Sequence, residues 1–82
     1  MSLESTVIFD KIRDILKLHT TIDIPITRDI RIGADLAIDS VEMFDLVMEI
    51  EDTYDISFPI EEASAIDTVG SLVDAISRLT DV

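Results

Sequence analysis

Apolar residues recur at helical spacing in both the first and the last part of the chain. In residues 3–19 isoleucines and leucines return every three or four positions, and Lys17 and His19 suit the carboxyl end of a helix. The pattern is most regular near the end, at i, i+3, i+4, i+7 and i+10: Val69, Leu72, Val73, Ile76 and Leu79. These two patterns predict a first helix over about residues 3–19 and a last helix that opens with Asp67 or Thr68 as its cap.

A further helix is predicted between these two, from residue 40 to about Tyr54. Asp39 suits its N-cap and Glu42 stands three residues later, which is the spacing of a capping box. Its core-facing stripe contains Met43, Leu46, Val47, Ile50 and Tyr54. Pro59 fits the start of a short third helix over about residues 60–65.

Residues 20–38 are ambiguous, because their isoleucines alternate as they would in short strands. Pro25, Gly33 and several charged residues interrupt that alternation. We interpret the segment as an extended loop whose isoleucines pack on a helical core. The predicted fold is all-α: a small four-helix bundle of three longer helices and one short third helix, with a long loop between helices 1 and 2. We expect residues 1–82 to form a single domain.

The face of the second predicted helix that points away from the core is not purely polar. Val41, Phe44 and Met48 lie there among several acidic residues. Exposed apolar groups among like charges are typical of transient interfaces. The alternative is a helix buried on two sides, with Phe44 in the core.

The net charge of −12 comes entirely from the second half of the sequence. Residues 1–34 hold five acidic and five basic residues, whereas residues 35–82 hold thirteen acidic residues and one base, Arg78. Such a field disfavours binding to nucleic acid and insertion into anionic membranes, and it attracts basic proteins. We therefore expect a docking surface for a basic partner, although acidity that merely maintains solubility is the alternative.

Ser40 is the main candidate for chemistry. Catalysis by this serine would need a base, and His19, the one histidine of the chain, is predicted to be a surface residue at a helix end and not a ligand. A hydroxyl at a helix N-terminus can instead carry a phosphodiester, because the helix dipole favours negative charge there. The chain has no cysteine, so any thiol must arrive on such a group. We expect no metal site, since the acidic residues do not follow the spacing of a calcium-binding loop.

Three segments at fixed distances resemble the acyl carrier proteins. They are Asp39-Ser40-Val41 with the acidic helix behind it, Tyr54 to Pro59, and Thr68-Val69-Gly70. The similarity extends from Leu3 to Leu79. It implies that Ser40, beside the capping residue Asp39, receives 4′-phosphopantetheine from coenzyme A through a phosphopantetheinyl transferase.

The resemblance also implies the roles of other residues. The family presents its recognition helix to synthases and transferases with basic docking patches, and the matching residues are Val41, Glu42, Asp45, Met48, Glu51 and Asp52. The family lines an acyl cavity between its helices, and the matching residues are Leu46, Ile50, Phe58, Ala63 and Ile66. We thus expect a non-catalytic, monomeric, cytoplasmic carrier that holds acyl groups as thioesters in fatty acid or related lipid biosynthesis.

Several residues near Ser40 depart from the family pattern. Ala37 replaces a glycine and Val41 replaces a leucine, while Met43 and Glu49 also differ from the usual residues. These departures favour a specialised carrier over the housekeeping carrier of fatty acid synthesis. An aminoacyl, peptidyl or polyketide carrier, or an unmodified acidic interaction module, are the alternatives.

Overall fold

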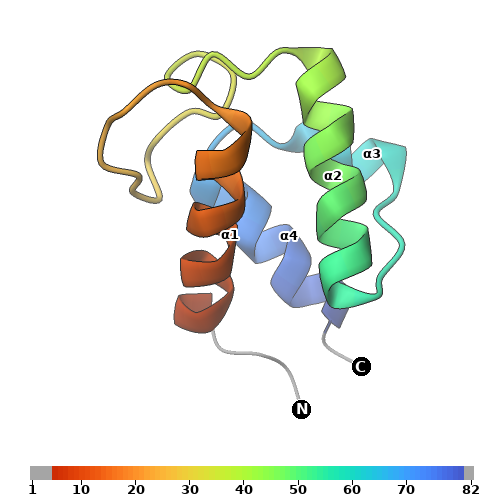
Figure 1. Cartoon of the computed structure of the whole chain (residues 1–82). Coiled ribbons are helices and arrows are strands. Elements are labelled where there is room, and N and C mark those ends of the chain that lie inside the picture. The colour runs from red at the N-terminus through yellow and green to blue at the C-terminus, as the bar shows by residue number, and fades with distance from the viewer. Residues whose placement is uncertain (1–4, 81–82) are drawn as a thin grey trace.

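A computed structural model of the protein describes residues 5–80. Four helices follow one another along the chain: α1 (Ser5–His19), α2 (Ser40–Tyr54), α3 (Ile60–Ala65) and α4 (Val69–Thr80). Helices α1, α2 and α4 surround the core, with α3 beside α2 (Figure 1). No strand forms among residues 5–80, so the predicted four-helix fold is confirmed. The predicted start of the first helix at Leu3 lies outside the described residues.

The ends of the helices follow from their capping residues. The Asp39 carboxylate accepts a hydrogen bond from the Glu42 N–H at 2.9 Å and caps α2, as predicted. At α4, Thr68 Oγ1 accepts the Ser71 N–H at 3.1 Å, and Ser71 Oγ accepts the Thr68 N–H at the same distance. This reciprocal pair selects Thr68, and not Asp67, as the cap of the last helix.

The core is apolar and receives residues from helices and loop alike. Helices α1 and α4 contribute its largest part, including the fully buried residues Ile8, Ile12, Leu16, Leu72 and Ile76. From α2, Leu46, Val47 and Ile50 are buried, whereas Met43 and Tyr54 of the predicted stripe are only partly buried. Phe44 is 60% exposed and therefore not part of the core.

The long loop between α1 and α2 lies over one end of the bundle and is fastened to the start of α4. The Ile32 N–H donates to the Asp67 carbonyl, and the Val69 N–H donates to the Ile30 carbonyl, both at 2.9 Å. One isolated bridge, between Arg31 and Thr68, is the only β-structure within the described chain. The loop buries Ile26, Ile32, Leu36 and Ile38. The interpretation of residues 20–38 as a loop that packs on the core is therefore correct.

Gly70 is required where the loop passes closest to α4. Its N–H donates to the Arg28 carbonyl at 2.9 Å. A Cβ atom at this position would lie 3.2 Å from that same carbonyl oxygen and 3.3 Å from the Arg28 Cβ. Because both atoms are held by the loop, a side chain here would push the loop away from α4.

Ala37 occupies the left-handed backbone region, with φ of 56°. This turn allows Leu36 and Ile38, on either side of it, to be buried while Ala37 stays exposed. A left-handed conformation costs an L-residue about 1–2 kcal/mol, a cost that glycine avoids.

We therefore expect Ala37→Gly to raise the free energy of unfolding by about 1 kcal/mol. Urea denaturation followed by circular dichroism measures the change. Ala63→Gly is the matched control, because Ala63 lies inside α3 and glycine should lower stability there. Destabilisation by both substitutions would contradict the strain assigned to Ala37.

Candidate functional site

Ser40 is the first residue of α2 and is exposed. The Asp39 cap leaves the backbone of Asp39 extended (φ −82°, ψ 179°), so that the chain turns into the helix at Ser40. The hydroxyl thus lies at the positive end of the α2 dipole, where an attached anion is favoured. This position suits a serine that another enzyme modifies.

An apolar pocket of about 190 Å³ opens beside Ser40, between α2 and α3. Its lining residues are Ser40, Met43, Phe44 and Val47 from α2, and Ile60, Ala63 and Ser64 from α3. The α2 members lie three, four and seven residues after Ser40, which places them on the same side of the helix. A group attached to Ser40 would therefore meet an apolar surface at once.

The pocket beside Ser40 is not the cavity expected from the family resemblance. Of the five expected residues only Ala63 lines it. Leu46, Ile50 and Phe58 are buried in the core, and Ile66 packs against the core partly buried. The pocket residues Met43, Phe44, Val47, Ile60 and Ser64 were not predicted to line it. Helical spacing from Ser40 could have found those of α2, but those of α3 depend on how the two helices pack.

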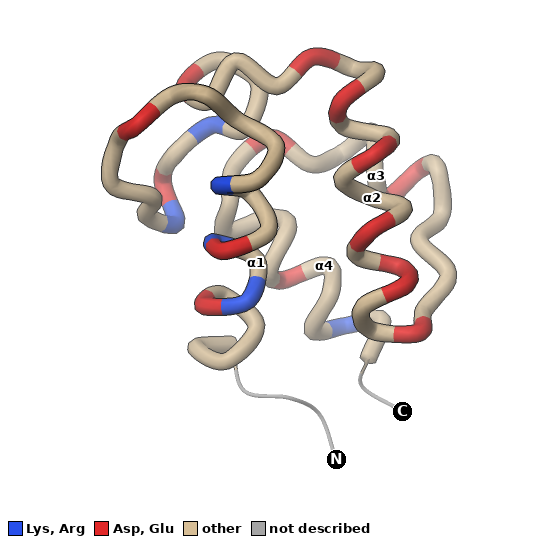
Figure 2. The backbone as a smooth tube through the Cα atoms, viewed as in Figure 1, with Lys and Arg blue, Asp and Glu red and all other residues tan. Residues whose placement is uncertain are grey.

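The predicted partner-binding residues form two groups. Val41, Asp45, Met48 and Asp52 are exposed and follow one another at helical spacing, which defines the exposed stripe of α2. Val41 is 70% and Met48 65% exposed, so both apolar members face solvent as expected. Acidic residues continue along the whole of α2, whereas Lys and Arg lie mostly on α1 and the loop (Figure 2).

Glu42 and Glu51, the other two predicted partner-binding residues, are bonded within the fold. A Glu42 carboxylate oxygen pairs with His19 Nδ1 at 3.1 Å. Glu51 accepts the backbone N–H of Phe58 at 2.8 Å and so holds the segment that follows α2. Both are half-buried, which leaves part of each carboxylate accessible to a partner.

His19 is not the surface residue that the sequence suggested. Its side chain is only 13% exposed, and it bridges α1 to α2: Nδ1 lies 3.1 Å from Glu42 and Nε2 lies 2.8 Å from Glu49. A neutral imidazole can donate only one hydrogen bond, so donation to both carboxylates requires the protonated ring. With both nitrogens engaged, His19 is not placed to act as a base toward Ser40.

The two carboxylates determine how His19 titrates. Burial by itself would lower the pKa of His19, but hydrogen bonds and charge from Glu49 and Glu42 together outweigh burial. The pKa is therefore raised above its ordinary value of 6.5. Since the raised value belongs to the folded state, the bridge stabilises the fold fully below pH 6.5 and loses its effect as the pH rises through the folded pKa.

We expect the melting temperature of the protein to fall as the pH increases from about 6 to about 9, the range in which a histidine with a raised pKa loses its proton. His19→Gln should weaken this dependence. The α-amino group titrates in both proteins, so its contribution cancels when the two melting-temperature curves are subtracted. Differential scanning calorimetry across this range is the measurement. Equal slopes for the two proteins would show that the bridge is not linked to protonation.

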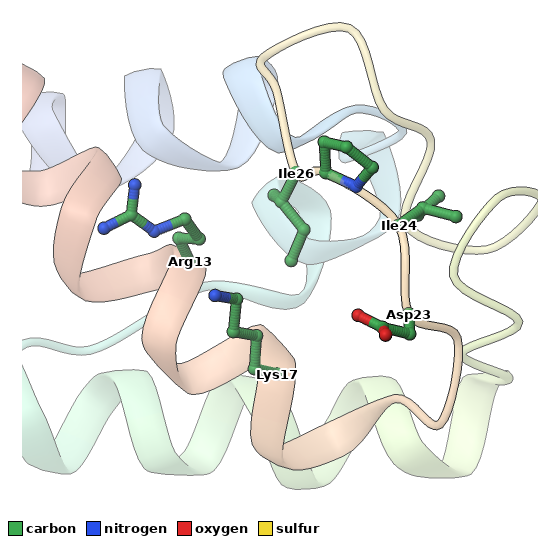
Figure 3. Close-up of a pocket in the computed structure, with 6 residues that line it drawn as sticks. Arg13, Lys17, Asp23, Ile24 and Ile26 are labelled. Carbon is green, nitrogen blue, oxygen red and sulfur yellow. The ribbon is translucent and has the colours of Figure 1, made fainter.

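A larger cleft, of about 440 Å³, lies between α1 and the loop and shares no residue with the pocket at Ser40. Arg13 and Lys17 reach into it from successive turns of α1, and Asp23 and Ile26 point toward them from the loop, whereas Ile24 points away (Figure 3). Its mixed charges, and its lining by α1 and the loop, separate this cleft from the candidate site between α2 and α3.

Residues 5–80 contain neither a metal-binding cluster nor a membrane-spanning helix. No three His, Cys, Asp or Glu side chains gather there in a way that could hold a metal ion. Over the same residues, every helix is too short or too polar to cross a lipid bilayer.

Comparisons with known proteins agree with this geometry. Residues 6–76 match the family model described as a phosphopantetheine attachment site. A curated protein of Caulobacter vibrioides (strain NA1000 / CB15N), named "Probable acyl carrier protein", is 44% identical over 48 residues, which are 58% of this chain and 56% of that protein. The alignment thus spans little more than half the length of that relative.

A solved structure is similar over nearly the whole fold. It is a protein of Mycobacterium tuberculosis named "a putative acyl carrier protein", with a TM-score of 0.81 and 28% sequence identity. The match covers 87% of this chain and 96% of that one.

Proposed function

Because the chain belongs to the acyl carrier proteins, the non-catalytic carriers with a phosphopantetheine attachment site, we propose that Ser40 is the residue that carries the group. A phosphopantetheinyl transferase would transfer 4′-phosphopantetheine from coenzyme A to the Ser40 hydroxyl. The group supplies the thiol on which acyl chains are held as thioesters.

The single observation that carries this proposal is the position of Ser40. Its exposed hydroxyl stands at the capped N-terminus of a 15-residue helix and at the mouth of an apolar pocket. The helix terminus favours the phosphodiester, and the apolar wall suits the first carbons of an acyl chain. The Asp39 carboxylate accepts the Glu42 N–H, and the Glu42 carboxylate is bonded to His19, so both carboxylates near Ser40 are engaged in hydrogen bonds.

The exposed stripe of α2 is the proposed docking surface for the transferase and for the enzymes that load and unload the carrier. Asp45 and Asp52 would attract basic side chains, while Val41 and Met48 would supply apolar contact. Glu42 and Glu51 would contribute through the accessible parts of their carboxylates. Charge then determines the rate of encounter, and the apolar residues determine the fit.

The proposed cargo is an acyl chain of fatty acid or related lipid biosynthesis. The apolar lining of the pocket beside Ser40 supports an aliphatic load over an aminoacyl or peptidyl one. Leu46, Ile50, Phe58 and Ile66 stay candidates for a deeper acyl cavity, since α2 and α3 would have to separate before a longer chain reached them. We further propose that the carrier acts as a monomer in the cytoplasm.

Intact-mass spectrometry tests the proposed function. The purified chain is incubated with coenzyme A and a phosphopantetheinyl transferase of broad specificity, and we expect a gain of one phosphopantetheine group. An unchanged mass, under conditions in which a known carrier is modified, would refute the proposal and favour an unmodified interaction module. Thioester profiling of the protein from its native cells distinguishes the cargo, because an aminoacyl load would refute the lipid assignment.

A further inference from the structure

The contact between α1 and α2 contains a histidine shared by two carboxylates. His19 reaches Oε2 of Glu42 with one ring nitrogen and Oε1 of Glu49 with the other. The histidine is largely covered, whereas each glutamate side chain is 39% exposed. The carboxylates thus lie at the boundary between the α1–α2 contact and the solvent.

Each of these carboxylates has one oxygen without a hydrogen-bond partner in the described chain. Within residues 5–80, Oε1 of Glu42 and Oε2 of Glu49 accept no hydrogen bond. Since the other oxygen of each group is held by His19, the orientation of the free oxygen is fixed by the fold. An outside cation could bind it without displacing the histidine.

Three carboxylates on one side of α2 indicate the kind of partner. The backbones of Glu42 and Glu49 are seven residues, or about 10 Å, apart along α2, and their side chains converge on one imidazole ring. Asp45 lies between them on the same side of the helix and is exposed. This arrangement fits a protein surface with two neighbouring cationic side chains, with arginine favoured because its guanidinium group matches a carboxylate.

We propose that His19 is a positioning residue for docking, which holds the carboxylates of Glu42 and Glu49 in the orientation that a basic partner enzyme binds. The inference rests on the proposed function, since it assumes that the carrier docks through α2. A free glutamate loses side-chain freedom when it pairs with a partner, and that loss weakens surface ion pairs. Here folding has already ordered both side chains, so docking would cost less entropy.

Glu42 and Glu49 are also the charged groups that raise the pKa of His19, so protonation of His19 should control the orientation of both carboxylates. The protonated ring donates to both glutamates, whereas the neutral ring donates to one. Loss of the proton therefore releases one carboxylate from its fixed position. Lys17, two residues earlier on α1, is exposed and lines the cleft on the loop side.

The test is the steady-state kinetics of phosphopantetheine transfer, with the full chain in its unmodified form as the varied substrate. We expect His19→Gln to raise KM for the carrier about threefold to tenfold and to leave kcat unchanged. Lys17→Gln, which removes a positive charge from the same end of α1, is the matched control and should leave KM within about twofold. Circular dichroism confirms that each variant is folded at the assay temperature.

A pH series separates positioning from a merely structural role. The ratio of the KM of His19→Gln to that of the wild type should fall toward one as the pH rises from about 6 to about 9, because deprotonation removes the bridge from the wild type as well. The transferase's own pH dependence cancels in this ratio. As a second measurement, Glu49→Gln should raise KM in the wild type but have little effect in the His19→Gln background.

The outcomes distinguish this inference from the proposed function. Absence of transfer to the wild-type chain refutes the function and the inference together. Normal transfer to the wild type with an unchanged KM for His19→Gln refutes the inference alone, as does a ratio that does not vary with pH. A fall in kcat at constant KM would also overturn it, since His19 would then act on Ser40 and not on docking.

Discussion

Ser40→Ala is expected to abolish the gain in mass on incubation with coenzyme A and a transferase, while leaving the fold unchanged. The hydroxyl is the atom to which the phosphate would become attached, and alanine removes it. Alanine is well tolerated at the first position of a helix, and the Asp39 cap does not involve the Ser40 side chain. We therefore expect the same melting temperature within a few degrees and no modification.

Ser64 provides the matched control for this experiment. It lies on α3 and lines the same pocket as Ser40, so both hydroxyls are in similar surroundings. Ser64 is not at a capped helix N-terminus and follows no family motif. Ser64→Ala should be modified as fast as the wild type. Modification of the Ser40→Ala variant, or loss of modification in the Ser64→Ala variant, would show that Ser40 is not the attachment site.

Leu16→Ala is expected to be the most destabilising of the simple substitutions. Leu16 is 0% exposed in the part of α1 that faces the core. Its truncation should cost about 2–5 kcal/mol, since the surrounding side chains cannot fill the space completely. Small domains have about 0.05–0.15 kcal/mol of stability per residue, so this loss is a large fraction of the total. The melting temperature should fall by about 10 °C or more.

Leu18→Ala is the control for this prediction, because it makes the same change two residues away on the same helix. Leu18 is 78% exposed, and its truncation should alter stability by no more than about 0.5 kcal/mol. Thermal unfolding of both variants at the same pH gives the comparison. Equal losses of stability would mean that α1 does not pack on the core through the face described above.

The helices and their caps were predictable because their causes are local. Asp39 and Thr68 each cap a helix through residues three positions further on, so the sequence alone contains both partners. The acidic face of α2 was predictable for the same reason. The structure of residues 20–38 was harder to predict, because buried isoleucines can alternate along a loop as they do along a strand.

Other features depend on contacts between distant residues. His19 pairs with residues 23 and 30 positions away, so nothing near it in the sequence indicates the bridge. The α3 side of the pocket likewise depends on the packing of two helices. The left-handed turn at Ala37 could not be predicted from alanine itself, which does not favour that conformation.

The bonds between the loop and α4 have a consequence for synthesis of the chain. Arg28, Ile30 and Ile32 are held by backbone groups of residues 67–70, which are made after both the loop and Ser40. On the ribosome, the segment that leads into Ser40 therefore lacks its hydrogen-bond partners until residue 70 has emerged from the exit tunnel. We expect a nascent chain that ends before this point to be a poor substrate for the transferase, which would restrict attachment to chains in which residues 67–70 have already joined the fold.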